Sequence, residues 1–308
     1  MKISRFILAS LFISLALLSL VYFLLPQLLV DPLISLNQSL SGLSKKSIQI
    51  EDHKIYYLEG GHGETIVLLH GIFSEKDHFV DFARELTDRY RVVIPDIPGF
   101  GESTRLAGGQ YDYATQGKRL QSFFDALGID NFHIAGNSMG GTLAALYSIH
   151  NPARVKSLAF IGAPHGLKTP LPSLMDNLVE QKKAPLVVRS PEEFERMLDM
   201  LFFKRPFIPY PVLQKTRASS IQLADDNERI FWRQHENRYI LQDNLALITA
   251  PTLAIWGENE HIFHPSGAQV LKTQKPDQQV IVMPETGHLP QMEKPKQAAR
   301  HYLDFIQR

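Results

Sequence analysis

The 308-residue sequence has no cysteine and no excess of either charge, and these absences exclude several kinds of site. Without cysteine the chain forms no disulfide, offers no thiolate metal ligand and has no cysteine nucleophile. Lys+Arg and Asp+Glu both number 32, so the net charge is zero and the basic excess that drives nucleic-acid binding is missing. We therefore expect no nucleic-acid partner, no cofactor and no metal ion. Because 44% of the residues are hydrophobic, the chain can still bury a large core.

Charge is also missing from a long stretch near the N-terminus. Residues 6–25 are uncharged and mostly apolar, and as a helix they would span roughly 30 Å, the thickness of a bilayer core. This predicts a transmembrane anchor. A cleaved signal peptide is the alternative, but its apolar region is shorter, about 7–15 residues, and ends in small residues that are missing here. Lys2 and Arg5 precede the stretch, so residues 1–5 are predicted to be a cytoplasmic tail, with the rest of the chain periplasmic or extracellular.

Beyond a predicted interfacial linker at 26–47, short β-branched runs alternate with longer stretches of helical spacing. Near-continuous apolar runs are typical of parallel strands covered on both faces, so the alternation predicts an α/β fold with a mostly parallel sheet. The predicted strands are 65–70, 91–96, 132–136, 155–162, 252–257 and 279–284. The predicted helices are 76–90, 112–127, 138–150, 265–273 and 295–307.

One interval interrupts this alternation. Residues 165–248 contain no convincing core strand but several short amphipathic stretches separated by prolines. The interval is too long for an ordinary loop, so we expect a helical cap between a first part of the core, 48–164, and a second part, 249–308. As a group, its apolar side chains are expected to line a substrate pocket. They are Met175, Leu178, Met197, Leu198, Leu201, Phe202 and Phe203.

A Gly-x-Ser-x-Gly pattern lies where a predicted strand becomes a predicted helix, in "HIAGNSMGGTLAALY". Such a turn holds its serine in a strained conformation, and side chains at both flanking positions would collide with neighbouring elements, which explains Gly136 and Gly140. The turn presents the hydroxyl of Ser138 and directs the N–H of Met139 toward a carbonyl under attack. Ser138 is therefore the candidate nucleophile.

A serine nucleophile needs a base, and the base needs an orienting acid. Of the 12 histidines, His288 follows the last predicted strand in a glycine-preceded turn, whereas His70 ends a strand beside a glycine and is expected to brace that turn. The acid should lie between Ser138 and the histidine at the end of a strand. "AIWGENEHIF" offers Glu258 and Glu260, and Glu260 is the better placed.

The motifs "LLHGIF", "DIPGFGEST", "GNSMGG", "IWGENEHIF" and "TGHLPQMEKP", in this order, resemble the α/β-hydrolase superfamily. The N-terminal stretch and the length resemble bacterial membrane-associated lipases of the Moraxella and Psychrobacter type and the anchored monoacylglycerol lipases of animals. The resemblance implies Ser138 as nucleophile, Glu260 as acid and His288 as base. It also implies an oxyanion hole formed by the backbone N–H groups of Ile72 and Met139. Glu260 departs from the family pattern, where the acid is commonly Asp.

A serine nucleophile argues against epoxide hydrolases and dehalogenases, which need a carboxylate. The leading interpretation is a membrane-anchored hydrolase of lipid-like carboxylic esters, such as monoacylglycerols or medium-chain acyl esters, working through an acyl-enzyme. A C–C bond hydrolase of aromatic meta-cleavage products is the alternative, and the predicted anchor counts against it because those enzymes are soluble. A binding protein that kept the fold is disfavoured by the correct order of Ser138, Glu260 and His288.

Overall fold

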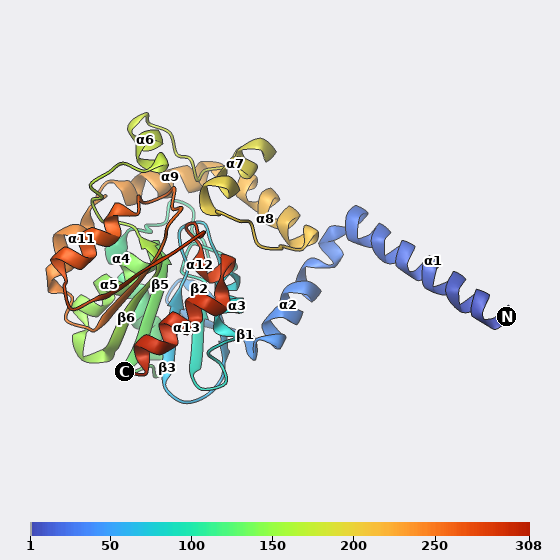
Figure 1. The fold of residues 1–308 in the computed structure, drawn as a ribbon, viewed down its shortest axis with the longest axis horizontal. Helices are drawn as coiled ribbons and strands as arrows, with labels where there is room; N and C mark the ends of the chain where they lie inside the picture. The colour runs from blue at the N-terminus through green and yellow to red at the C-terminus, as the bar shows by residue number, and fades with distance from the viewer. Residues whose placement is uncertain (1) are drawn as a thin grey trace.

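An eight-stranded sheet forms the centre of the computed structural model (Figure 1). Its order is β1-β2-β4-β3-β5-β6-β7-β8, with β3 to β8 mutually parallel and β1 and β2 an antiparallel hairpin at one edge. All six predicted strands are present, which confirms the predicted α/β fold, whereas the hairpin was not predicted. The strands are β1 (Leu43–Ile50), β2 (His53–Gly60), β3 (Thr65–Leu69), β4 (Arg91–Pro95), β5 (Phe132–Ser138), β6 (Val155–Pro164), β7 (Thr252–Gly257) and β8 (Gln279–Met283).

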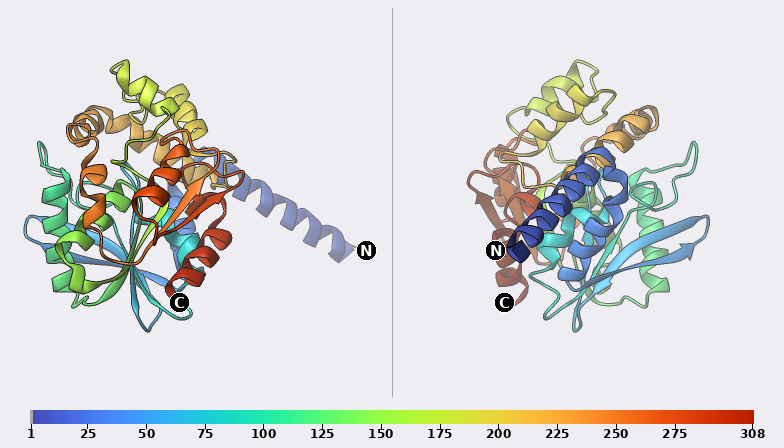
Figure 2. Two further views of the ribbon diagram at one scale, coloured as in Figure 1. Left: turned by 60° about the vertical axis from the view of Figure 1, so that its left-hand side comes forward. Right: turned by 90° about the vertical axis from the view of Figure 1, so that its right-hand side faces the viewer.

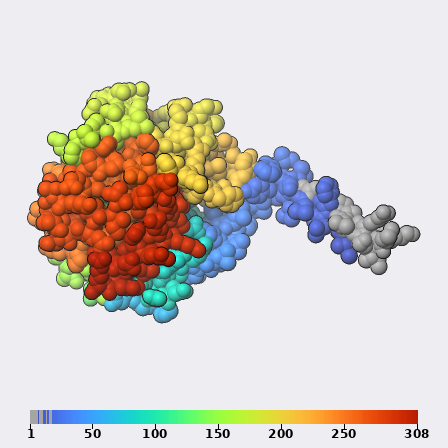
Figure 3. All heavy atoms as spheres, viewed as in Figure 1, coloured from blue at the N-terminus to red at the C-terminus, as the bar shows by residue number. Residues whose placement is uncertain are grey.

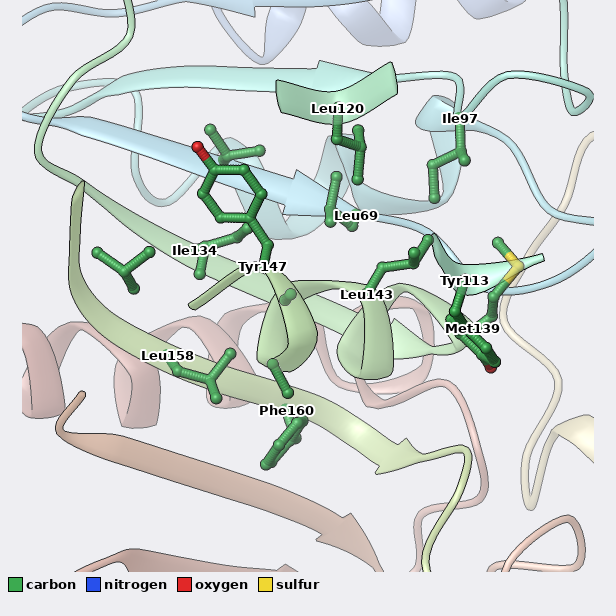
Figure 4. Close-up of a cluster of buried hydrophobic side chains, with 14 of the residues drawn as sticks. Leu69, Ile97, Tyr113, Leu120, Ile134, Met139, Leu143, Tyr147, Leu158 and Phe160 are labelled. Atoms are coloured by element: carbon green, nitrogen blue, oxygen red, sulfur yellow. The ribbon is translucent and has the colours of Figure 1, made fainter. Parts of the chain in front are cut away.

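Helices cover both faces of the sheet, which is why the parallel strands are apolar along their length (Figures 1 and 2). On one face, Phe82 of α3 (Val80–Ala83) and Tyr302 of α13 (Pro295–Ile306) are buried against the strands. The other face is covered by α4 (Tyr113–Ala126), α5 (Met139–His150) and α11 (Ser266–Gln274). Figure 4 shows this second cluster, with Leu120 and Leu143 beside the strands that carry Ile134 and Phe160.

The interval predicted as a cap is helical throughout its regular structure. It contains α6 (Leu174–Glu180), α7 (Pro191–Leu201), α8 (Tyr210–Gln222), α9 (Ala224–His235) and α10 (Ile240–Asn244). Figure 1 shows α6 to α9 together on one side of the sheet. Ser138 at the end of β5 shares a cavity with cap residues, so the cap covers the end of the sheet at which the parallel strands finish.

The structure describes residues 2–308, apart from the side chains of 2–6, 8–10, 13, 16 and 17. Met1 and the side chains of the predicted tail at 1–5 therefore lie outside the described residues. Helix α1 (Lys2–Leu24) extends away from the rest of the molecule (Figure 1). No helix passes, on its described residues alone, a test of length and apolarity for spanning a membrane, but Leu18–Leu24 and Pro26–Leu40 pass it together as a pair bent by 105°.

The segment predicted as an interfacial linker, 26–47, has regular structure. It forms a short 3₁₀ turn, η1 (Pro26–Leu28), then α2 (Val30–Leu40), and β1 already begins at Leu43. The backbone N–H of Tyr210 in α8 donates to the hydroxyl of Tyr22 in α1 at 2.8 Å. In Figure 3 the atoms that follow α1 adjoin those of the cap. The N-terminal segment is thus joined to the cap as well as to the sheet.

Candidate active site

Ser138 has the backbone conformation that the glycine pattern predicts. Its φ is +53° and its ψ is −119°, a region that a residue with a side chain rarely adopts. A Cβ on Gly136 would come within 2.3 Å of the Gly140 carbonyl carbon, and one on Gly140 within 2.2 Å of the Leu69 carbonyl oxygen. Both glycines are therefore required by the close passage of β3, β5 and α5. Strain held in this way by its surroundings is a feature of functional turns.

The structure defines the surroundings of the two backbone N–H groups that were predicted to form an oxyanion hole, those of Met139 and Ile72. Met139 is the first residue of α5, so its N–H is one that helical hydrogen bonding leaves free. Nδ1 of His70 lies 2.7 Å from the carbonyl oxygen of Gly71, and Nε2 accepts the N–H of Ile97 at 3.0 Å. The Gly71–Ile72 peptide is trans, so its carbonyl and the N–H of Ile72 point in opposite directions. His70 thereby fixes the direction of the Ile72 N–H.

His70 braces this turn in its neutral form, which agrees with the expectation from the sequence. The side chain is fully buried, and burial lowers its pKa to about 4. Its Nε2 accepts a hydrogen bond from a backbone N–H, so the proton lies on Nδ1, which donates to Gly71. The next residue but one after Gly71 is Phe73, whose φ is +56°. The loop after β3 thus contains a second strained turn, and a Cβ on its Gly71 would come within 3.3 Å of Cβ of Ser138.

The structure brings the other predicted site residues together from the ends of β7 and β8. Nδ1 of His288 lies 2.7 Å from Oε2 of Glu260, and both side chains are buried. Oε1 of Glu260 accepts the N–H of Ile262 at 2.7 Å. Glu258, the other carboxylate of the same turn, is exposed and does not contact His288 among the described interactions. Ser138 and His288 line one cavity.

Two further residues hold this arrangement and were not singled out from the sequence. Nδ2 of Asn137 donates to the carbonyl oxygens of Ile161 at 2.8 Å and of His288 at 3.0 Å. These bonds connect the serine turn to β6 and to the loop after β8 that carries His288, called the histidine loop below. Glu293, at the end of α12 (Pro290–Glu293), accepts the N–H of Gly287 at 2.8 Å. Asn137 stood inside the quoted motif, but its partners are distant in sequence and could not be read from it.

A cavity of about 430 Å³ leads from Ser138 and His288 to the surface between the cap and the N-terminal segment. Its walls are mostly apolar, as is usual for small-molecule sites of ~300–1,000 Å³. One wall comes from the cap and another from α2, with Leu33 and Leu36 among its lining residues. The segment predicted as a linker therefore forms part of the cavity, which the sequence did not indicate.

The apolar cap residues divide between the cavity and the packing of the cap. Four of the seven line the cavity: Met197, Leu198, Leu201 and Phe202. Met175 and Leu178 instead pack inside the cap, in a cluster with Phe231. Phe203 is 48% exposed and is not among the lining residues. The prediction that the group lines the cavity at Ser138 is thus right for the four residues in or directly after α7. It is wrong for Met175 and Leu178, which lie on α6 and pack inside the cap, and for the exposed Phe203.

Comparison with known proteins agrees with this fold. A model of the alpha/beta hydrolase fold matches residues 64–295. Lipase 1 of Psychrobacter immobilis is 31% identical over 284 residues, which cover 89% of this chain and 87% of that protein. The human monoacylglycerol lipase ABHD6 is 28% identical over 279 residues, covering 86% of this chain and 82% of that protein.

Among solved structures, a bacterial membrane phospholipase A, described as a virulence factor, is similar with a TM-score of 0.89 and 36% identity. The match covers 100% of this chain and 98% of that one. The resemblance to bacterial lipases and monoacylglycerol lipases that the motifs indicated is therefore confirmed. With the family model matching well over half of its length, this chain belongs to the α/β-hydrolase family.

Proposed function

We propose that this chain hydrolyses carboxylic esters of lipids through an acyl-enzyme on Ser138. The observation that carries the proposal is the buried His288–Glu260 pair, 2.7 Å apart, at the same mostly apolar cavity as the strained serine turn. The named activities of the relatives, a lipase, a monoacylglycerol lipase and a phospholipase A, support the same reaction class. An apolar cavity of this kind suits an acyl chain.

In the proposed reaction, Nε2 of His288 takes the proton of the Ser138 hydroxyl as its oxygen attacks the ester carbonyl. The N–H groups of Ile72 and Met139 donate to the oxygen that becomes negative, a contribution usually worth about 3–4 kcal/mol per donor. Glu260 stabilises the imidazolium and keeps the remaining proton on Nδ1. His288 then returns its proton to the departing alcohol, and water repeats the sequence to release the fatty acid.

A test of the reaction uses the purified full chain in detergent. We expect turnover of p-nitrophenyl butyrate and laurate and of 1-lauroyl glycerol, and labelling of Ser138 by a fluorophosphonate, located by mass spectrometry. The Ser138→Ala variant is the blank in both assays. A ring-fission dienoate is the competing substrate. Faster turnover of the dienoate than of every ester would favour C–C hydrolysis and overturn the proposal.

We also propose that α1 anchors the chain in a membrane, with Lys2 and Arg5 on the cytoplasmic side and the catalytic part outside. The uncharged stretch 6–25 supports this, as does the extension of α1 away from the core (Figure 2). Reporter fusions placed after Gly42, between α2 and β1, measure the topology. A cytoplasmic reporter signal, or a mature N-terminus near residue 30, would contradict it.

A further inference from the structure

Glu75 is a carboxyl group at the cavity that the proposed reaction does not use. It lies three residues after Ile72, immediately before the 3₁₀ turn η2 (Lys76–Phe79), and lines the cavity shared by Ser138 and His288. Across the described residues, no group donates a hydrogen bond to its carboxyl oxygens. The side chain is half-buried at the cavity wall, so a ligand in the cavity can pair with its carboxyl group.

The charged groups of the cavity are all acidic. Three carboxylates line it, and no lysine or arginine does so in the described part of the chain. Asp77 accepts Nε2 of Gln38 at 2.7 Å and lies 3.4 Å from Nζ of Lys76. Asp81 is an exposed residue paired with Arg84 at 3.0 Å. Glu75 is thus the carboxyl group of this cavity that remains available to a ligand.

The surroundings of Glu75 make its charge sensitive to pH near neutrality. Burial raises its pKa to about 7, opposed by Lys215 of α8 and by Lys76, and reinforced by Asp77 and Asp96. Below that pH the group is a neutral acid, and above it a carboxylate. The imidazole groups at the same cavity are His288 and His78, and burial lowers the pKa of His78 to about 4. His78 therefore adds no positive charge to offset the carboxylate at pH 6 or above.

We propose that Glu75 selects the head group of the lipid, favouring uncharged hydroxyl-bearing or cationic head groups over anionic ones. This inference rests on the proposed ester hydrolysis at Ser138. A protonated or ionised carboxyl group hydrogen-bonds to glycerol hydroxyls and, once ionised, attracts an ammonium group. A phosphate near it meets a like charge in an apolar cavity with no lysine or arginine in its described lining. The penalty on anionic lipids should therefore grow as pH rises through 7.

Three lauroyl esters with fixed charge provide the test: 1-lauroyl glycerol, lauroylcholine and 1-lauroyl lysophosphatidylglycerol. The assay measures kcat/KM for the full chain at pH 6 and pH 8.5. Ratios between substrates cancel any effect of pH on the catalytic steps that all three esters share. For the unmodified chain, we expect a tenfold or larger preference for the neutral over the anionic ester at pH 8.5, several-fold larger than at pH 6. Lauroylcholine should gain over the neutral ester in the same interval.

The Glu75→Gln variant should lower the ratio of kcat/KM for the neutral ester over the anionic ester to threefold or less and remove the pH dependence of this ratio. Glu75→Asp keeps the carboxyl group and should retain both the preference and its pH dependence. Glu85→Gln is the matched control, because Glu85 is an exposed carboxylate nearby in sequence that does not line the cavity. Unchanged ratios in active Glu75→Gln protein would overturn the inference and leave the proposed function standing. Absence of turnover of all three esters and of p-nitrophenyl laurate would overturn both.

Discussion

Replacing Glu260 by glutamine tests which carboxylate orients His288, and its contacts determine the effect. Oε1 accepts the N–H of Ile262 at 2.7 Å, and Oε2 lies 2.7 Å from Nδ1 of His288. In the variant, the backbone donor should keep the amide oxygen, so the amide NH₂ group faces His288. Nδ1 then has to accept, and the proton moves to Nε2. That tautomer cannot take the proton of Ser138.

A carboxylate-to-amide change that imposes the wrong tautomer lowers turnover by about 10⁴ in a serine protease. At ~1.36 kcal/mol per tenfold change in rate, this corresponds to about 5.5 kcal/mol of activation free energy. Glu258→Gln is the matched control, since Glu258 is exposed on the same turn, and the hydrogen bond that its carboxyl group accepts from the N–H of Glu285 is long, at 3.4 Å. We expect the control to keep its turnover within about twofold.

The assay compares steady-state kcat for p-nitrophenyl butyrate in the unmodified chain and the two variants, with thermal melting by circular dichroism as the folding control. Glu260→Gln should melt as a single cooperative transition while losing turnover. If a folded Glu260→Gln protein retains more than a tenth of kcat, or if Glu258→Gln is the more damaging change, Glu260 is not the orienting acid.

Five other substitutions test the site. Ser138→Ala and His288→Ala should each lower turnover by 10⁴ or more with the fold intact, and near-normal activity in either folded variant would refute its role. Asn137→Ala removes the side-chain donor to the buried carbonyls of Ile161 and His288, so it should destabilise the protein by about 2–4 kcal/mol in urea unfolding. It should also lower kcat about 10–100-fold, mostly without changing KM, and an unchanged kcat would show that the loop carrying His288 keeps its position without Asn137. Each CH₂ of the substrate's acyl chain that the cavity buries should stabilise the transition state by about 0.8 kcal/mol, which is roughly a fourfold rise in kcat/KM. Phe202→Ser, in the cavity wall, should therefore flatten the rise in kcat/KM from acetate to laurate esters, whereas Phe203→Ser, at an exposed position, should not.

The parts of the fold that follow hydrophobic patterning could be predicted from the sequence. Buried parallel strands are uniformly apolar, so each of the six gave a signal. The β1–β2 hairpin did not, because β1 is an edge strand whose middle residues, including Lys45 and Lys46, face solvent. Of the helix predicted over 76–90, only Val80–Ala83 is α-helical. The segment starts instead as a 3₁₀ turn at Lys76, whose side chain pairs with the buried Asp96 at 2.9 Å. That contact depends on β4 and leaves no local pattern.

The residues of the candidate site also fall into those that could be predicted from the sequence and those that could not. Ser138, Glu260 and His288 could be proposed because each follows a predicted strand, and the carboxyl ends of parallel strands share one edge of the sheet. Asn137 could not be assigned, because the His288 carbonyl that it binds is 151 residues away in sequence. The lining role of α2 was missed for a related reason. A segment rich in leucine near a predicted anchor suggests an interface with lipid, and only the tertiary structure places it beside Ser138.

Hydrogen bonds couple the cap to the histidine loop, and this coupling affects how substitutions in the cap should be interpreted. The N–H of His288 donates to the carbonyl oxygen of Leu201 at the end of α7, at 2.8 Å. Glu293 accepts from Gly287 in the histidine loop and, at 3.0 Å, from the N–H groups of Phe203 and Lys204 in the cap. A shift of α7 therefore moves the backbone that carries His288. Substitutions on the cap wall of the cavity should alter kcat for all esters together with chain-length preference, so acyl selectivity has to be measured as a ratio of kcat/KM values within each variant.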